Sequence, residues 1–253
     1  MDDLTRLRAG LGDSLSGADT ALDAADRLCR ACVDLLHLDG ASISLIREGA
    51  SQGTFGSSNE LSRRLDEYQF TYGEGPCLDA VSTGLPVLAP DLEDVHEHRW
   101  PAFTAATVSH GVLAVFALPV VIASTPVGAL DLFHHQPGAL SGDRMNGSRL
   151  AAQLASVPLL ALMRLDFELG DEDIKAEPWD QLASLERVEV YQATGMIMGA
   201  LDVSAPEALV RLRAYAYAQG LTASDVAWLI VERQLMPDAD DWWRGLHRGG
   251  EPT

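Results

Sequence analysis

Apolar side chains recur at steps of three or four residues along three consecutive segments near the C-terminal end of the chain. The recurring positions are Val190, Ala193, Ile197 and Leu201, then Leu209, Leu212 and Ala216, then Val226 and Ile230. Such spacing places each set on one face of a helix. Ser204 and Thr222 each precede an acid by three residues, as in a capping box, and Gly220 provides a stop. The pattern predicts a three-helix domain over residues 181–236, followed by a tail over residues 237–253.

Residues 16–165 carry a mixed pattern that predicts one α/β domain. Polar and apolar side chains alternate over residues 41–47, and a return strand begins at Thr54. Two later runs, residues 111–120 and 126–133, are almost entirely apolar, as in a buried antiparallel hairpin. The strands therefore belong to a central antiparallel sheet.

Two long helices flank the predicted strands. The first has one apolar seam, made of Leu22, Ala25, Cys29, Cys32 and Leu36. The second, over residues 140–165, is apolar around most of its circumference and must be buried on several sides. We expect the two helices to form the seam of a homodimer. Residues 1–15 hold few large apolar groups, which predicts a flexible N-terminus, and residues 166–180 form an acidic linker.

The charge of the chain restricts its partners. The sequence of 253 residues has 37 acidic and 18 basic side chains, for a net charge of −19. This surplus argues against general affinity for nucleic acid or anionic membranes, so any RNA recognition must be local. The sequence shows no secretory signal, and its longest apolar run, residues 112–123, is broken by Pro119. These features predict a cytoplasmic protein with no membrane segment.

The three cysteines do not form a framework of disulfides or metal ligands. Cys29 and Cys32 have the spacing of a redox or zinc motif, but both fall on the apolar seam of the first long helix and no second pair completes the site. We therefore expect them to be buried structural thiols, and we predict no metal site. The odd number of cysteines is typical of a reducing compartment.

The C-terminal segment resembles a known family. The run from Arg187 to Met198, RVEVYQATGMIM, and the later groups Glu207-Ala208-Leu209, Leu212-Arg213 and Asp225-Val226-Ala227 are similar to the ANTAR domain of bacterial antitermination regulators. The resemblance implies a small all-α module, usually paired as a dimer, that binds stem-loops in nascent mRNA. Thr194 stands where many members carry lysine.

The side chains that could contact RNA in this module are few. Arginines suit phosphates, amide and hydroxyl groups suit base edges, and tyrosines suit stacking. A glycine within a helix suits a close approach to the backbone. The candidate residues are Arg187, Gln192, Thr194, Gly195, Arg211, Arg213 and Tyr215.

The first domain resembles the GAF family. The motifs are the run from Tyr72 to Val87, with Gly73, Gly75-Pro76 and Gly84, then Trp100-Pro101-Ala102-Phe103 and the two apolar strands. The resemblance implies an α/β sensor with a central antiparallel sheet, flanking helices and a small-molecule pocket over one face. The candidate pocket residues are Cys77, Trp100, Phe103 and Phe116.

The ligand and any cofactor are not identified by the sequence. Cyclic nucleotides are disfavoured because no lysine precedes Lys175, and a phosphate cradle at residues 73–77 is disfavoured by Glu74. Haem would need an axial histidine, for which the candidates are His110, His134 and His135.

The leading hypothesis is a two-domain regulator of the actinobacterial type. Its GAF domain would sense a small ligand or a redox state, and its ANTAR module would bind RNA without any catalytic residue. One alternative is a regulator whose C-terminal module mediates protein interaction or dimerisation without RNA. Another is a thiol redox enzyme with the GAF fold that acts through Cys77.

Overall fold

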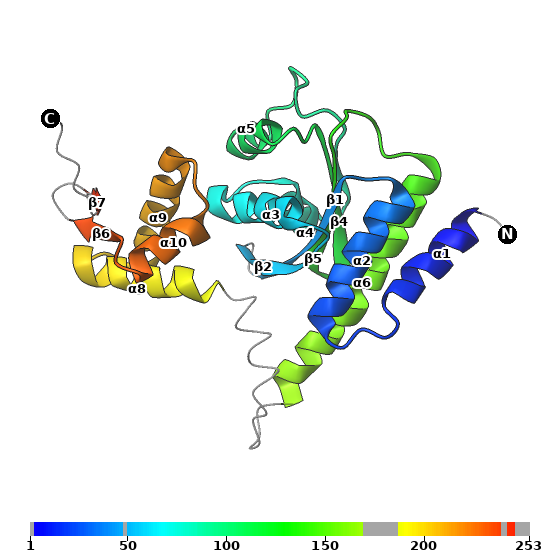
Figure 1. The fold of residues 1–253 in the computed structure, drawn as a ribbon, viewed down its shortest axis with the longest axis horizontal. Helices are drawn as coiled ribbons and strands as arrows, with labels where there is room; N and C mark the ends of the chain where they lie inside the picture. Colours follow the sequence, from blue (N-terminus) through cyan, green and yellow to red (C-terminus); the bar gives the residue numbers. More distant parts are fainter. Residues whose placement is uncertain (1–2, 48–49, 169–186, 239–241, 246–253) are drawn as a thin grey trace, which may run out of the picture. The chain divides into compact units, whose positions relative to one another are not determined.

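The structure, a computed structural model, describes residues 3–47, 50–168, 187–238 and 242–245. Contacts divide the chain into two compact units, Met1–Glu186 and Arg187–Thr253 (Figure 1). Most of the predicted acidic linker, residues 169–180, lies outside the described residues.

An antiparallel sheet with strand order β2-β1-β5-β4-β3 forms the centre of the first unit. Its strands are β1 (Gly40–Arg47), β2 (Ala50–Ser57), β3 (Val87–Ala89), β4 (Ala114–Ile122) and β5 (Thr125–His134). In the β1–β5 pair, Ser42 is opposite Asp131 and Ser44 is opposite Ala129. Because side chains alternate between the two faces of a strand, these four side chains share one face of the sheet.

Helices α2 (Ala21–Leu36) and α6 (Gly142–Glu168) cover the other face of the sheet, and α1 (Asp3–Ser14) packs against both of them (Figure 1). The main apolar core lies between these helices and the strands. The prediction of a flexible N-terminus over residues 1–15 is corrected here, because residues 3–14 form a helix. Its Leu11 is fully buried and its Leu7 packs against the core, so a sparse apolar stripe is enough to fix it.

The face that carries Ser42 and Asp131 is covered by α3 (Glu60–Tyr72), α4 (Pro76–Thr83) and α5 (Pro101–Ser109). Helix α4 begins with a first-turn proline and ends at Gly84, whose φ is +68°, as its sequence predicts. Glu74 Oε1 accepts hydrogen bonds from the backbone N–H groups of Ala102 and Phe103, at 2.7 and 3.0 Å. This carboxylate therefore caps the start of α5 from the turn that precedes α4.

The cysteines of α2 are buried as predicted. Burial raises the pKa of the Cys32 thiol to about 12. The pKa of the Cys29 thiol is also raised, mainly by burial and to a lesser degree by the nearby Cys32 and Asp26. At pH 8 we expect both thiols in the native protein to react with iodoacetamide roughly a thousand-fold more slowly than in urea-unfolded protein, because the thiolate is scarce. Peptide mapping by mass spectrometry measures each site. Rapid labelling of either cysteine in the native state would contradict the assignment.

The second unit contains three helices, α8 (Val188–Leu201), α9 (Ala205–Gln219) and α10 (Ala223–Val231). Their apolar faces meet in a small core, whose fully buried members are Ala193, Ile197, Ala208, Leu212, Ala216, Ala223, Val226, Ala227 and Ile230. Thr222 and Asp225 form the predicted capping box, whereas the side chain of Ser204 makes no capping hydrogen bond. The helical pattern therefore holds, but one of its two predicted caps does not form.

A short hairpin follows the third helix, where the sequence predicts only a tail. Strand β6 (Leu235–Asp238) pairs antiparallel with β7 (Trp242–Gly245), and Leu235 is buried. Across the described part of the chain, no helix is long and apolar enough to cross a membrane.

Candidate functional site

A cluster of polar side chains is buried in the first unit between the sheet and helices α3 and α4. Strands contribute Ser42, Ser44, Thr54 and Asp131, helix α3 contributes Asp66 and Gln69, and helix α4 contributes Cys77. Thr54 is 8% exposed and the other six are fully buried. We call these seven residues the buried polar cluster. They occupy the sheet face over which the sequence predicts a ligand pocket.

Hydrogen bonds hold most of the cluster in place. Ser44 and Thr54, which are opposite each other in the β1–β2 pair, donate to the two oxygens of Asp66, with 2.5 Å between Thr54 Oγ1 and Asp66 Oδ2. Gln69 Nε2 donates to Asp131 Oδ2 at 2.5 Å, and Gln69 Oε1 accepts from the backbone N–H of Cys77 at 2.8 Å. Both carboxylates and the start of α4 are therefore tied to fixed elements of the fold.

The surroundings of Asp131 disfavour the ionised form of its carboxyl group. Burial raises the pKa of the Asp131 carboxyl well above its ordinary value, and the carboxylate of Asp66 raises it further, while the Gln69 hydrogen bond opposes both effects. Among the described residues, neither Asp131 Oδ1 nor Ser42 Oγ has a hydrogen-bond partner. Leaving a buried polar atom unsatisfied costs about 1–3 kcal/mol.

Three side chains of the cluster have the chemistry of metal ligands. One carboxylate oxygen each from Asp66 and Asp131 and the sulfur of Cys77 all lie within 4.8 Å of one another. They come from α3, β5 and α4, so the fold brings together residues that are far apart in the sequence. Such a set could bind a small cation.

The four pocket residues predicted from the sequence do not converge. Cys77 belongs to the buried polar cluster, whereas Trp100 and Phe103 pack in a separate apolar group beneath α5 with Leu65, among others. Phe116 is 1% exposed in the core under α2 and α6, on the opposite face of the sheet. Its place as a pocket wall is therefore corrected.

Sequence reasoning missed the acids and the glutamine of the cluster. Asp131 lies between Leu130 and Leu132 in an otherwise apolar strand, and this isolated carboxylate was the available signal. Asp66 and Gln69 could not be recognised as site residues from the sequence, because α3 is rich in polar residues and two more do not stand out.

The histidines considered for haem have other partners. His134 Nδ1 bonds to Asp39, His110 Nε2 lies 2.9 Å from the Tyr68 hydroxyl, and His135 Nδ1 lies 2.8 Å from the carbonyl oxygen of Gly111. All three lie at the ends of elements rather than in the buried polar cluster.

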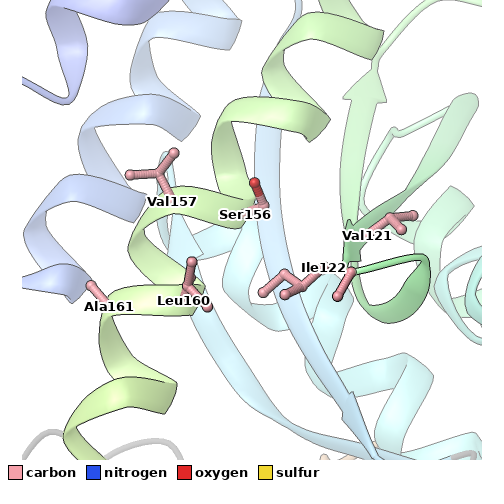
Figure 2. Close-up of a pocket in the computed structure, with 7 residues that line it drawn as sticks. Val121, Ile122, Ser156, Val157, Leu160 and Ala161 are labelled. Atoms are coloured by element: carbon pink, nitrogen blue, oxygen red, sulfur yellow. The ribbon is translucent and has the colours of Figure 1, made fainter.

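A second feature of the first unit is an apolar pocket at its surface, with a volume of about 430 Å³. Figure 2 shows side chains from α6 and from the end of β4 around it. Val157 is 56% exposed and Val121 is 43% exposed, so large apolar groups face solvent there. The predicted homodimer through the long helices would cover this pocket, and that assembly stays a prediction.

In the second unit, one face of α8 is open. Tyr191 is 60% exposed, and Gln192, Gly195, Met198 and Gly199 are exposed as well. A Cβ atom added at Gly195 or Gly199 would meet no atom within 4 Å. We call these five residues the glycine face of α8. A partner could approach its backbone closely.

The other predicted RNA-contact residues are placed differently. Thr194 is buried and donates to the Val190 carbonyl at 2.6 Å, and Arg187 is 6% exposed. Burial lowers the pKa of Arg213, and its neighbour Arg187 lowers it further. Arg211 forms an ion pair of 2.6 Å with Glu207, and Tyr215 is half-buried. Of the seven candidates, Gln192 and Gly195 are the ones on the open face.

Family models match both units. A model of the GAF domain matches residues 18–157, and a model of the ANTAR domain matches residues 181–231. No curated protein matches the sequence.

Solved structures share the fold of the first unit. The GAF domain of a phosphoenolpyruvate-protein phosphotransferase from Acinetobacter has 15% identity and a TM-score of 0.51, over 66% of this chain and 99% of that chain. The GAF domain of such an enzyme from Coxiella burnetii has 15% identity and a TM-score of 0.50, over 66% and 98%. A free methionine-R-sulfoxide reductase from Neisseria meningitidis has 13% identity and a TM-score of 0.48, over 65% and 95%. The first two likenesses show the fold alone.

Proposed function

The chain belongs to the GAF domain family and carries a small all-α ANTAR module after its α/β GAF domain, and from this membership we propose that it is a signal-responsive regulator of transcription antitermination. The GAF domain would sense a small ligand, and the ANTAR module would bind stem-loops in nascent mRNA. The observation that carries the proposal is the open glycine face of α8 within the segment that the ANTAR model matches.

The glycine face suits RNA better than the arginines do. An exposed glycine in a helix costs roughly 1 kcal/mol relative to alanine, and Gly195 has open space around it, so packing within the module does not require it. Gln192 can bond to base edges and Tyr191 can stack on a base. Because Arg187 is buried and Arg211 is ion-paired, we expect RNA affinity to fall less steeply with salt than for a basic module.

The regulatory step would be a shift in population. A ligand that binds one state of the GAF domain more tightly favours that state, and the ANTAR module would bind RNA differently in the two states. We propose a homodimer that forms through the long helices and a cytoplasmic location, where nascent mRNA is found in bacteria. No catalytic residue is needed. A thiol redox enzyme acting through Cys77 is less well supported, because this sulfur is fully buried and reactive thiols need access.

The test is the substitution Gly195→Ala. We expect it to raise the stability of the module by up to about 1 kcal/mol, since alanine favours a helix. We also expect at least a roughly ten-fold loss of affinity for paired stem-loop RNAs with hexanucleotide loops, because a methyl group blocks close approach. Fluorescence anisotropy at low and moderate salt measures the affinity. Gly12→Ala is the matched control, because Gly12 is also a helical glycine with open space, but in α1.

A second candidate function rests on the same face. Gly195 and Gly199 are four residues apart and lie beside the exposed side chains of Tyr191 and Met198, an arrangement that also suits close packing of two helices. If the native chain binds none of these RNAs and Gly195→Ala instead weakens self-association in sedimentation experiments, the module is a dimerisation unit. Equal RNA affinities of Gly195→Ala and Gly12→Ala would remove the glycine face from the RNA site.

A further inference from the structure

We propose that Asp66, Cys77 and Asp131 bind one divalent transition-metal ion with zinc-like preferences in the interior of the GAF domain. This inference deepens the proposed function, because it names the class of ligand for the sensor domain. It rests on the buried polar cluster. Of the residues in this cluster, only Cys77 was among the pocket residues predicted from the sequence. Its test needs no RNA, so it can fail or succeed separately from antitermination.

The spacing of the three ligand atoms fits one ion. The two carboxylate oxygens and the sulfur lie within 4.8 Å of one another. In a tetrahedral zinc site, with metal–ligand distances of about 2.0 Å to oxygen and 2.3 Å to sulfur, ligand atoms are roughly 3.3–3.5 Å apart. The three side chains are therefore close enough to reach one ion.

Two buried polar atoms of the cluster lack hydrogen-bond partners among the described residues. Asp131 is fully buried and its Oδ1 atom has no hydrogen-bond partner among the described residues. Ser42, directly opposite on β1 and also fully buried, has an unpartnered Oγ atom. Two ionised carboxylates that lie close together and out of water are costly, and either a proton on one of them or a cation between them removes that cost. A divalent ion would compensate the charge and give Asp131 Oδ1 a ligand bond.

The surroundings of the three ligands are those of a supported metal site. Ser44 and Thr54 donate to Asp66, and Gln69 donates to Asp131, so both carboxylates are oriented by neighbouring donors. Cys77 is the second residue of α4, where the partial positive charge of the helix start favours a thiolate. The backbone N–H of Cys77 is held by the Gln69 side chain at 2.8 Å, which links two of the ligands through one residue.

The donor set determines the class of metal. A thiolate with two carboxylates suits borderline ions such as Zn²⁺, Co²⁺ or Fe²⁺. Mg²⁺ and Ca²⁺ require six or more oxygen ligands and tend to retain water, which this buried cluster does not offer. Zn²⁺ and Co²⁺ are therefore the probes of choice, and Mg²⁺ is the negative comparison.

The experiment uses the full-length chain. After removal of metal with a chelator, we expect calorimetric titration to show one Zn²⁺ per chain and no binding of Mg²⁺. Co²⁺ should produce the near-ultraviolet charge-transfer band of a thiolate ligand and the visible bands of a tetrahedral site. Cys77→Ser should abolish the charge-transfer band and, like Asp131→Asn, weaken Zn²⁺ binding by about 100-fold or more. Cys29→Ala, which removes a buried thiol outside the cluster, should leave both signals unchanged.

Stability measurements distinguish a variant that has lost the metal site from one that no longer folds. In metal-free protein we expect Asp131→Asn to be at least as stable as the native chain, because a neutral amide keeps the Gln69 hydrogen bond and removes the repulsion with Asp66. Zn²⁺ should raise the melting temperature of the native chain but not that of Asp131→Asn. Less than stoichiometric Zn²⁺ uptake by the native chain, or an unchanged cobalt spectrum in Cys77→Ser, overturns the proposal. Neither result would alter the RNA measurements that test antitermination.

Discussion

Replacing Leu212 with alanine is expected to unfold the ANTAR module while the GAF domain stays folded. Leu212 is fully buried in the core of the three helices, and truncation of a buried leucine typically costs about 2–5 kcal/mol. A module with so small a core has little stability beyond that amount. The contacts of the two units are also largely internal to each, so unfolding of one need not spread to the other. RNA binding should be lost with the fold of the module.

Hydrogen exchange read by mass spectrometry can follow both units in one sample. In Leu212→Ala, amides of α8, α9 and α10 should exchange at unfolded rates, while those of the central sheet keep their protection. Val210→Ala is the matched control on the same helix, because Val210 is 63% exposed and its truncation should change stability by less than about 0.5 kcal/mol. Full protection of α8 to α10 in Leu212→Ala would show that the module draws its stability from contacts outside this core.

Phe116→Ala is expected to cost the GAF domain about 3–5 kcal/mol of unfolding free energy. The side chain is 1% exposed between β4 and the helices α2 and α6, where few neighbours can move to fill the space. Urea denaturation followed by far-ultraviolet circular dichroism measures the loss. Val121→Ala, on the same strand but 43% exposed, should lose far less. Unchanged stability together with altered binding of a ligand would instead return Phe116 to the wall of a pocket.

The order of helices and strands in this chain follows from its apolar pattern. The strands at residues 41–47, 111–120 and 126–133 and the three C-terminal helices are all present within a few residues of their predicted bounds. Local spacing suffices for these elements, because each has an apolar set that only one kind of element can bury.

The two faces of the sheet were harder to assign. Strand β4 is apolar at nearly every position, so no alternation shows which face holds Phe116. The structure places it in the core under α2 and α6, away from Cys77. The buried polar cluster could not be predicted from the local sequence pattern either. Asp66 and Asp131 become neighbours only through the packing of α3 on the sheet, which spacing along the chain does not reveal.

The predicted RNA-contact residues also differ in whether the structure leaves them exposed. Gly195 was identified as a place of close approach because a glycine within a helix is costly, and its surroundings are open as that argument requires. Arg187 and Thr194 were proposed from their chemistry alone, and both side chains are buried. Residue type indicates what a side chain can bind, whereas the helix face on which it lies decides whether it meets a partner.

Trp100 can serve as an optical reporter for the interior of the GAF domain, because two carboxylates that flank Cys77 connect this segment to α5 and to the indole. Glu74 holds the start of α5 through two backbone N–H groups, and Asp79 accepts from the indole of Trp100 at 2.9 Å. Both acids belong to the segment that carries Cys77, so a shift of this thiol would alter the surroundings of the indole ring. In a chain whose other four tryptophans are replaced, the emission of Trp100 would then register events at the buried polar cluster without a label or an added dye.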